Sequence, residues 1–153
     1  MQKIQWHWVS YSELTKAQLY ASMVLRQQVF VVEQDCPYLD ADNLDPQCWH
    51  LLGYDGSEPE AALSAYCRVV APGIKYPERS IGRVLSASEV RGRGLGRELM
   101  KQVIECIDNQ WGAQPLRISA QCYLSDFYSS FGFEPQSAPY QEDGIPHVEM
   151  LRP

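Results

Sequence analysis

Signals that would place a chain in a membrane or outside the cell are missing from this sequence. No apolar run is long enough to span a bilayer, and no apolar stretch follows basic residues near the N-terminus. We therefore expect a cytoplasmic protein with no membrane partner. The five cysteines are an odd number and include no C-x-x-C pair, which argues against a zinc site and a disulfide framework. No metal site is predicted, and the thiols are expected to be reduced.

Basic charge is also scarce. Lysine and arginine number 13 against 19 acidic residues, so the formal net charge is −6. Nucleic-acid binding requires a basic face, so this balance argues against a nucleic-acid partner. The chain shows no repeats, linkers or low-complexity tracts. Its 153 residues, of which 45% are hydrophobic and 21% charged, fit one globular domain, 1–153, with its own core.

The most informative feature that is present is a glycine-rich turn at positions 91–96, Arg-Gly-Arg-Gly-Leu-Gly. A short apolar run, Ile81 to Ser86, precedes it, and an amphipathic stretch, Leu95 to Ile107, follows it. A strand, a glycine turn and a helix start together form an anion site, because backbone N–H groups point inward and the helix dipole favours negative charge. Arginine side chains in and after the turn add positive charge. The pattern predicts a bound phosphate or pyrophosphate.

The spacing of the glycines narrows the choice of cofactor. A dinucleotide-binding turn reads G-x-G-x-x-G and a P-loop ends in Lys-Ser/Thr, and neither fits here. Arg91, Gly94 and Gly96 match R-x-x-G-x-G, which resembles the pyrophosphate-binding motif of the GNAT superfamily of acyl-CoA-dependent N-acyltransferases. A second family pattern, Y-x-x-x-G-F, is matched by Tyr128, Gly132 and Phe133. A predicted strand, 116–121, lies between the two motifs, as the family order requires.

Two further stretches resemble the ElaA-type subgroup of this superfamily: residues 26–38, R-Q-Q-V-F-V-V-E-Q-D-C-P-Y, and 142–147, E-D-G-I-P-H. This match spans nearly the full length of the chain. It does not identify the acceptor substrate.

The order of predicted elements agrees with an α/β (α+β) fold. Ile4 to Ser10 reads as a strand, and the capping-box pattern Thr15 to Gln18 opens a helix that runs to about Phe30. A hairpin of strands 49–54 and 61–70 follows, and 145–151 is the last strand. The resemblance implies a GNAT-like mixed, mostly antiparallel sheet with helices on both faces and a splayed central pair, the fourth and fifth strands.

The resemblance also implies that acetyl-CoA is the acyl donor and which residues hold it. The pyrophosphate would lie on the turn, and the pantetheine arm would pair with the fourth strand, where a bulge frees an amide to polarise the thioester carbonyl. Many family members have asparagine where this chain has Gln121. The expected cofactor-binding residues are Val84, Leu85, Ser86, Arg91, Gly92, Arg93, Gly94, Leu95, Gly96, Arg97 and Gln121.

Catalysis requires an acid for the leaving thiolate and a route for the amine protons. Tyr128 is the expected general acid, since a phenol is protonated at neutral pH. Glu33, at the end of the first helix, is the expected catalytic carboxylate in the substrate pocket. Its structural alternative is an ion pair with an arginine; the candidates are Arg26, Arg68 and Arg83. His50 and His147 are other candidate bases.

Two charged segments are also informative. Arg68 and Arg83 lie inside apolar strands, where an unpaired charge would be costly, so both need partners. The run Asp40 to Asp45 lacks the glycine and distal glutamate of an EF-hand, and we interpret it as a solvated acidic loop that attracts a cationic acceptor.

The sequence therefore predicts an enzyme that moves acetyl from acetyl-CoA to a primary amine on a small molecule or a protein. The acidic balance and Glu33 favour a cationic small molecule. Two alternatives stay open: a non-catalytic acyl-CoA sensor or partner-binding module, and a synthase that acylates S-adenosylmethionine. Edge strands near the C-terminus also offer a way to pair two subunits into a homodimer.

Overall fold

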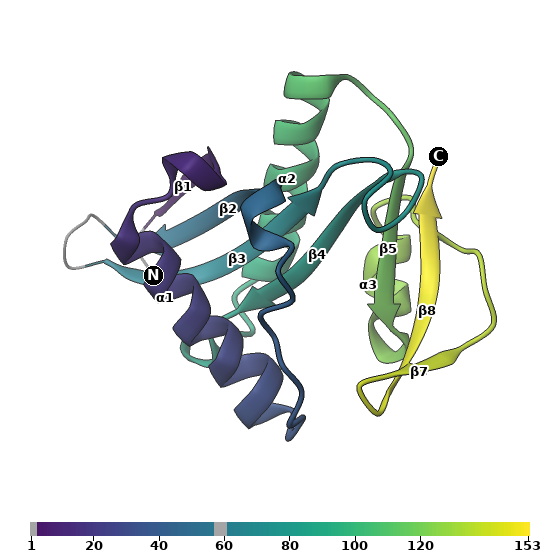
Figure 1. Cartoon of the computed structure of the whole chain (residues 1–153), viewed down its shortest axis with the longest axis horizontal. Helices are drawn as coiled ribbons and strands as arrows, with labels where there is room; N and C mark the ends of the chain where they lie inside the picture. The colour runs from purple at the N-terminus through teal and green to yellow at the C-terminus, as the bar shows by residue number, and fades with distance from the viewer. Residues whose placement is uncertain (1–2, 57–60) are drawn as a thin grey trace.

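The computed structural model describes residues 3–56 and 61–153 (Figure 1). In this part of the chain, eight strands form one mixed sheet in the order β1-β2-β3-β4-β5-β8-β6, with β7 also beside β8. Among these described strands, only β4 and β5 pair in parallel, and the other pairs are antiparallel. The strands are β1 (Ile4–Ser10), β2 (Cys48–Asp55), β3 (Ala62–Val70), β4 (Arg79–Ser86), β5 (Leu116–Gln121), β6 (Glu134–Pro135), β7 (Tyr140–Glu142) and β8 (Ile145–Arg152).

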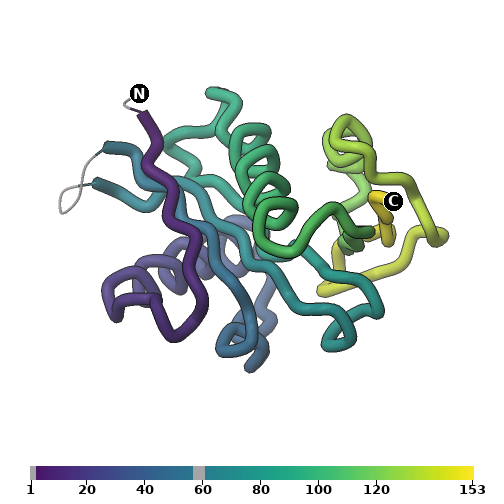
Figure 2. The backbone as a smooth tube through the Cα atoms, turned by 90° about the horizontal axis from the view of Figure 1, so that it is seen from above, coloured from purple at the N-terminus to yellow at the C-terminus, as the bar shows by residue number. Residues whose placement is uncertain are grey.

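Helices cover both faces of this sheet. Seen from above, α1 (Lys16–Arg26) lies on one side of the central strands and α2 (Leu95–Trp111) on the other (Figure 2). The short helix α3 (Ser125–Ser129) contacts β5. The predicted fold class is therefore confirmed. Among the described residues, no helix combines the length and the apolar character that crossing a lipid bilayer requires.

The first helix begins as its sequence suggests, but its C-terminal end differs from the prediction. Thr15 Oγ1 accepts a hydrogen bond from the Gln18 amide, and the Gln18 side chain accepts one from the Thr15 amide, both at 3.0 Å. This is the predicted capping box. The helix was predicted to end near Phe30, but it continues through a π-helical segment, η2 (Gln27–Glu33). The extra π-helical turn places Glu33 at the very end of the element.

The central strands separate where the resemblance predicted. β4 and β5 pair only at Arg79 with Leu116 and at Ser80 with Arg117, and then diverge (Figure 1). On its other edge, β4 has a bulge: Cys67 of β3 stands opposite two residues, Arg83 and Val84. Arg83 has a φ of 51°, which is unusual for a residue other than glycine. The bulge turns the β4 main chain just where the two strands part.

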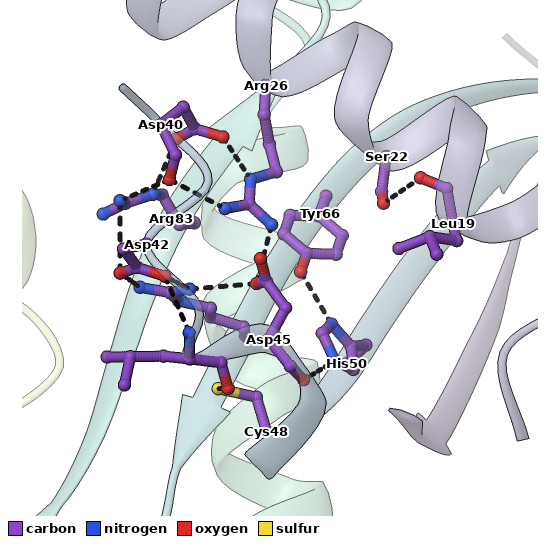
Figure 3. A network of polar contacts seen from close by, with 12 residues as sticks. Leu19, Ser22, Arg26, Asp40, Asp42, Asp45, Cys48, His50, Tyr66 and Arg83 are labelled. Carbon is purple, nitrogen blue, oxygen red and sulfur yellow. Dashed lines mark hydrogen bonds and ion pairs between the residues drawn. The ribbon is translucent and has the colours of Figure 1, made fainter. Parts of the chain in front are cut away.

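The acidic run 40–45 is not a solvated loop, so that prediction is wrong. Three arginines bind its aspartates in a largely buried network (Figure 3). Asp45 accepts hydrogen bonds from Arg26 at 2.8 Å and from Arg68 at 2.9 Å. Asp42 accepts from Arg68 at 2.8 and 2.5 Å, and the Arg83 Nε donates to Asp40 at 2.8 Å.

Arg68 and Arg83, the two arginines inside apolar strands, therefore have the carboxylate partners that the sequence predicted they need. The contacts with the aspartates also tie three elements together, because Arg26 ends α1, Arg68 lies in β3 and Arg83 in β4. Burial alone would raise the pKa of Asp42 and Asp45. The guanidinium groups outweigh burial and hold both pKa values below their usual range.

The C-terminal end contains strands that the sequence did not reveal. β6 and β7 both pair with β8, and β7 joins β8 through Asp143 and Gly144, whose φ values are 52° and 76°. Two consecutive positive φ values are typical of a two-residue hairpin turn. The predicted β2–β3 hairpin is present, although part of its connection, 57–60, lies outside the described residues.

Candidate active site

A cavity of about 420 Å³ fills the gap between β4 and β5. Its walls come from η2, β4, β5, α3 and the β7–β8 hairpin, which are far apart in the sequence. A second recess of about 250 Å³ lies over the glycine turn, and Ser86, Arg91, Gly96 and Phe127 line both spaces. The turn and the gap between the strands therefore form one continuous site.

The glycine turn has the conformation that an anion site needs. Gly92 and Gly94 have φ values of 82° and 75°, in the left-handed region that favours glycine. The first main-chain hydrogen bond of α2 runs from the Glu98 amide to the Gly94 carbonyl, at 3.1 Å. The amides of Leu95, Gly96 and Arg97 come before it and have no carbonyl partner within the helix. Among the described residues, no main-chain carbonyl accepts from the amides of residues 92–94. These amides are available to phosphate oxygens.

The three arginines in and just after the turn differ in the groups that they contact. The Arg91 Nη2 donates to the Ser86 carbonyl at 3.1 Å and to Glu33 at 3.0 Å. Arg97 donates to the Ser130 hydroxyl at 3.2 Å and lies over the ring of Phe131, 5.2 Å from its centroid. Arg93 has no hydrogen-bond or ion-pair partner among the described residues. Main-chain amides and Arg93 are therefore the groups least engaged elsewhere.

The structure brings the predicted cofactor strand to the same cavity. Val84, Leu85 and Ser86 line it directly after the bulge. Gln121, at the end of β5, lines the opposite wall and donates to the Gln34 side chain at 3.3 Å. The Gln121 amide thus lies in the cavity and is held by Gln34, the residue that follows η2.

Tyr128 also lines the cavity, in α3. Its side chain is 7% exposed and its ring packs edge-on against Phe127 and Phe133. Its hydroxyl has no hydrogen-bond partner in the part of the chain that the structure describes. Burial raises the pKa of Tyr128, so the phenol keeps its proton at neutral pH. A proton donor is therefore available at the cavity wall.

Glu33 lines the cavity, but its partner is not one of the three predicted. Both of its carboxylate oxygens bind Arg91, a residue of the glycine turn. The hydrogen bonds from Arg91 lower the pKa of Glu33 and keep the carboxylate ionised. Arg26, Arg68 and Arg83 instead bind the aspartates, because the fold places those aspartates within their reach.

The two histidines named as candidate bases lie in different surroundings. His50 is 1% exposed and is bonded to the Tyr66 hydroxyl at 2.7 Å and the Asp45 carbonyl at 3.0 Å. Burial lowers the pKa of His50, and this residue does not line the cavity. His147 does line it, and its Nε2 lies 3.3 Å from Glu142.

Several residues that line the cavity were not predicted from the sequence as site residues. Ser119 lines the cavity beside Gln121, and its hydroxyl lies 2.5 Å from that of Tyr140. The i, i+2 spacing of Ser119 and Gln121 in β5 could have shown that both face the same side. The Asp-Gly turn after Glu142 could have placed that carboxylate near His147. Neither signal indicates which face borders the cavity.

A mixed sheet that opens between two parallel strands, with an amide-rich glycine turn at the opening, defines the acyl-CoA N-acyltransferase class of fold. A family model described as "Acetyltransferase (GNAT) domain" matches residues 71–152. ElaA of Escherichia coli K12 is 41% identical over 151 residues, covering 97% of this chain and 96% of that protein. This chain belongs to the GNAT acetyltransferase family.

Solved structures of similar proteins agree with this family assignment. The crystal structure of an acyl-CoA N-acyltransferase from Pseudomonas aeruginosa superimposes with a TM-score of 0.91 at 37% identity, covering 99% of this chain and 100% of that one. The crystal structure of Escherichia coli ElaA gives a TM-score of 0.89 at 39% identity, with the same coverage. The predicted family and subgroup resemblance are confirmed.

Proposed function

We propose that this protein transfers the acetyl group of acetyl-CoA to a primary amine by direct attack, with Tyr128 as general acid. The observation that carries the proposal is that Tyr128 lines the same cavity as the β4 edge, from Val84 to Ser86, and that this cavity meets the glycine turn. A cofactor bound on the turn with its arm along β4 would place the thioester in the gap between the strands. Glu33, on the cavity wall, contributes a carboxylate that attracts a protonated amine.

Main-chain amides and side chains of the site can be assigned to each step of the transfer. The turn amides from Gly92 to Arg97 hold the pyrophosphate, and main chain at the β4 bulge polarises the thioester carbonyl. The amine nitrogen bonds to the carbonyl carbon, and the carbon–sulfur bond then breaks. Tyr128 gives its proton to the departing thiolate and regains one that the nitrogen releases. Gln121 bonds the cofactor arm.

The first test is a thermal-shift titration with acetyl-CoA, using adenosine diphosphate and NAD as controls. A ligand that binds only the folded state stabilises it by about 2.7 kcal/mol at a hundredfold its dissociation constant. A saturable rise in Tm specific to acetyl-CoA is expected. No rise, with the protein folded, would remove the cofactor assignment and the proposal with it.

The second test separates an enzyme from a protein that only holds the cofactor. A panel of primary amines is screened for release of the CoA thiol, and Tyr128→Phe is compared with Tyr20→Phe, whose tyrosine is 74% exposed on α1. We expect Tyr128→Phe to lose about ten- to ten-thousandfold in kcat while binding acetyl-CoA normally. Binding without turnover in the wild type would favour the sensor alternative. The acetyl preference, the cytoplasmic location and a homodimer stay predictions from sequence.

A further inference from the structure

One histidine in the cavity wall has different partners at its two ring nitrogens. His147 is 7% exposed, and its Nδ1 lies 2.7 Å from the Ile145 carbonyl. A carbonyl oxygen only accepts, so Nδ1 carries the hydrogen. In the neutral ring, Nε2 then holds a lone pair. That nitrogen lies 3.3 Å from the Glu142 carboxylate, which can stabilise a proton arriving there.

The ring is held in this orientation from several sides. It stacks on Tyr140 with ring centroids 6.2 Å apart and planes 27° apart, and the Tyr140 hydroxyl lies 2.5 Å from Ser119 Oγ. The β5–β8 register places His147 directly opposite Gln121. Side chains at such positions lie about 5 Å apart at Cβ, so the imidazole lies next to the amide proposed to bind the cofactor arm.

We propose that His147, assisted by Glu142, is the general base that takes a proton from a primary ammonium acceptor. The inference rests on the proposed N-acetyl transfer. The ammonium binds between the Nε2 lone pair and the Glu142 carboxylate, and one proton passes to Nε2. The neutral amine then attacks the thioester carbonyl carbon. The imidazolium, paired with Glu142, later returns its proton to solvent, so each turnover releases one proton.

Other cavity groups are less suited to this step. Both oxygens of Glu33 are bound to Arg91, which holds the carboxylate ionised and makes it a weak base. The Cys36 thiol donates to the carbonyls of Gln34 and Asp143, each at 3.5 Å. His147 is the one imidazole among the described residues that line the cavity, and its Nε2 lies 3.3 Å from the Glu142 carboxylate.

Other titratable groups lie close enough to influence the pair. Lys75, which lines the cavity, interacts electrostatically with Glu142. Tyr76 and Tyr140 interact with Glu142 and with Glu149 of β8. Glu142 lies 3.3 Å from the His147 Nε2, so its substitution changes the charge beside the imidazole directly.

The experiment measures thiol release from acetyl-CoA with n-butylamine and O-methylhydroxylamine, and with the best amine from the panel, across pH 5.5–9 (an interval of about three and a half units that includes the histidine reference pKa). An alkylamine is protonated at pH 7 and needs a base, whereas O-methylhydroxylamine is a much weaker base, is neutral at that pH and needs no deprotonation before it attacks. We expect His147→Gln to lower kcat with alkylamines by about a hundredfold or more and to affect O-methylhydroxylamine much less. Glu142→Gln should move the acidic limb of the pH profile to lower pH. His7→Gln, on β1 away from the cavity, serves as the control.

The outcomes separate the two proposals. Equal loss with alkylamines and O-methylhydroxylamine in His147→Gln, or an acidic limb that Glu142→Gln leaves in place, would overturn the base assignment while leaving N-acetyl transfer intact. A wild type that binds acetyl-CoA but transfers to none of the amines would overturn both. Free imidazole should restore alkylamine turnover to His147→Gly, which a purely structural histidine would not allow. If His147→Gln does not fold, the Glu142→Gln profile alone decides, because that side chain is 43% exposed.

Discussion

The guanidinium of Arg91 binds the carboxylate of Glu33, so a residue of the glycine turn is joined to the last residue of the π-helical segment 58 positions earlier in the chain. The same guanidinium also donates to the Ser86 carbonyl, at the end of β4. The side proposed for the cofactor and the side proposed for the acceptor therefore meet at one ion pair.

This ion pair predicts coupled effects on activity. If Arg91 positions Glu33 for the acceptor, then Arg91→Gln and Glu33→Gln should each raise KM for the amine, and the double variant should resemble the worse single variant. The measurement is a double-mutant cycle on kcat/KM. Independent, additive losses would show that Arg91 acts on the cofactor alone.

The same pair should contribute little to stability. The side chains are 39% and 42% exposed, and exposed ion pairs are worth about 0–1 kcal/mol and weaken with salt. Chemical denaturation of Glu33→Gln should therefore show a free energy of unfolding close to that of the wild type. A large loss would mean that the π-helical segment depends on this contact for its conformation.

A glycine substitution can test the turn. Gly94→Ala places a side chain at a φ of 75°, where left-handed backbone costs about 1–2 kcal/mol, and should also shift the turn amides. We expect weaker acetyl-CoA binding by isothermal titration. Gly73→Ala is the control, because Gly73 also has a positive φ, 86°, and lines neither the cavity nor the recess over the glycine turn. It should lose stability and keep its affinity; equal affinity in both variants would contradict the turn assignment.

The aspartate–arginine network should dominate stability. Asp45→Asn leaves two almost fully buried guanidinium groups, of Arg26 and Arg68, short of a counter-charge. Breaking one partner of a buried pair costs about 3–5 kcal/mol. Urea denaturation measures this loss. Glu78→Gln, which removes the charge of a more exposed carboxylate paired with Arg117, is the control and should cost much less. Similar losses in the two variants would show that burial does not set the energy.

The pH dependence of folding follows from the same carboxylates. The pKa values of Asp42 and Asp45 are lowered in the folded protein, so their stabilisation is fully present above the unfolded pKa of about 3.9. It is lost as pH falls through the lower folded values. These two groups should leave the free energy of unfolding nearly constant from pH 7 to 5 and decrease it below about pH 4. Asp45→Asn should flatten that acidic decrease.

The sequence alone determined the features that depend on neighbouring residues. Local backbone geometry governs the glycine turn, the Thr15–Gln18 capping box and the alternation of β1 and β5. Each of these features could therefore be predicted from a few positions. The order of the motifs was sufficient to predict the family and the separation of β4 from β5. The π-helical end of the first helix escaped because its residues read like an ordinary helix.

Only the tertiary structure decided which charged group meets which. The sequence pointed to Arg26, Arg68 or Arg83 as the partner of Glu33, whereas in the structure those three bind aspartates and Arg91 binds Glu33. The pairing of His147 with Glu142 across the β7–β8 turn also had to be seen. Ion pairs are long-range contacts between interchangeable charges, and the path of the folded chain, which no local pattern records, selects among them.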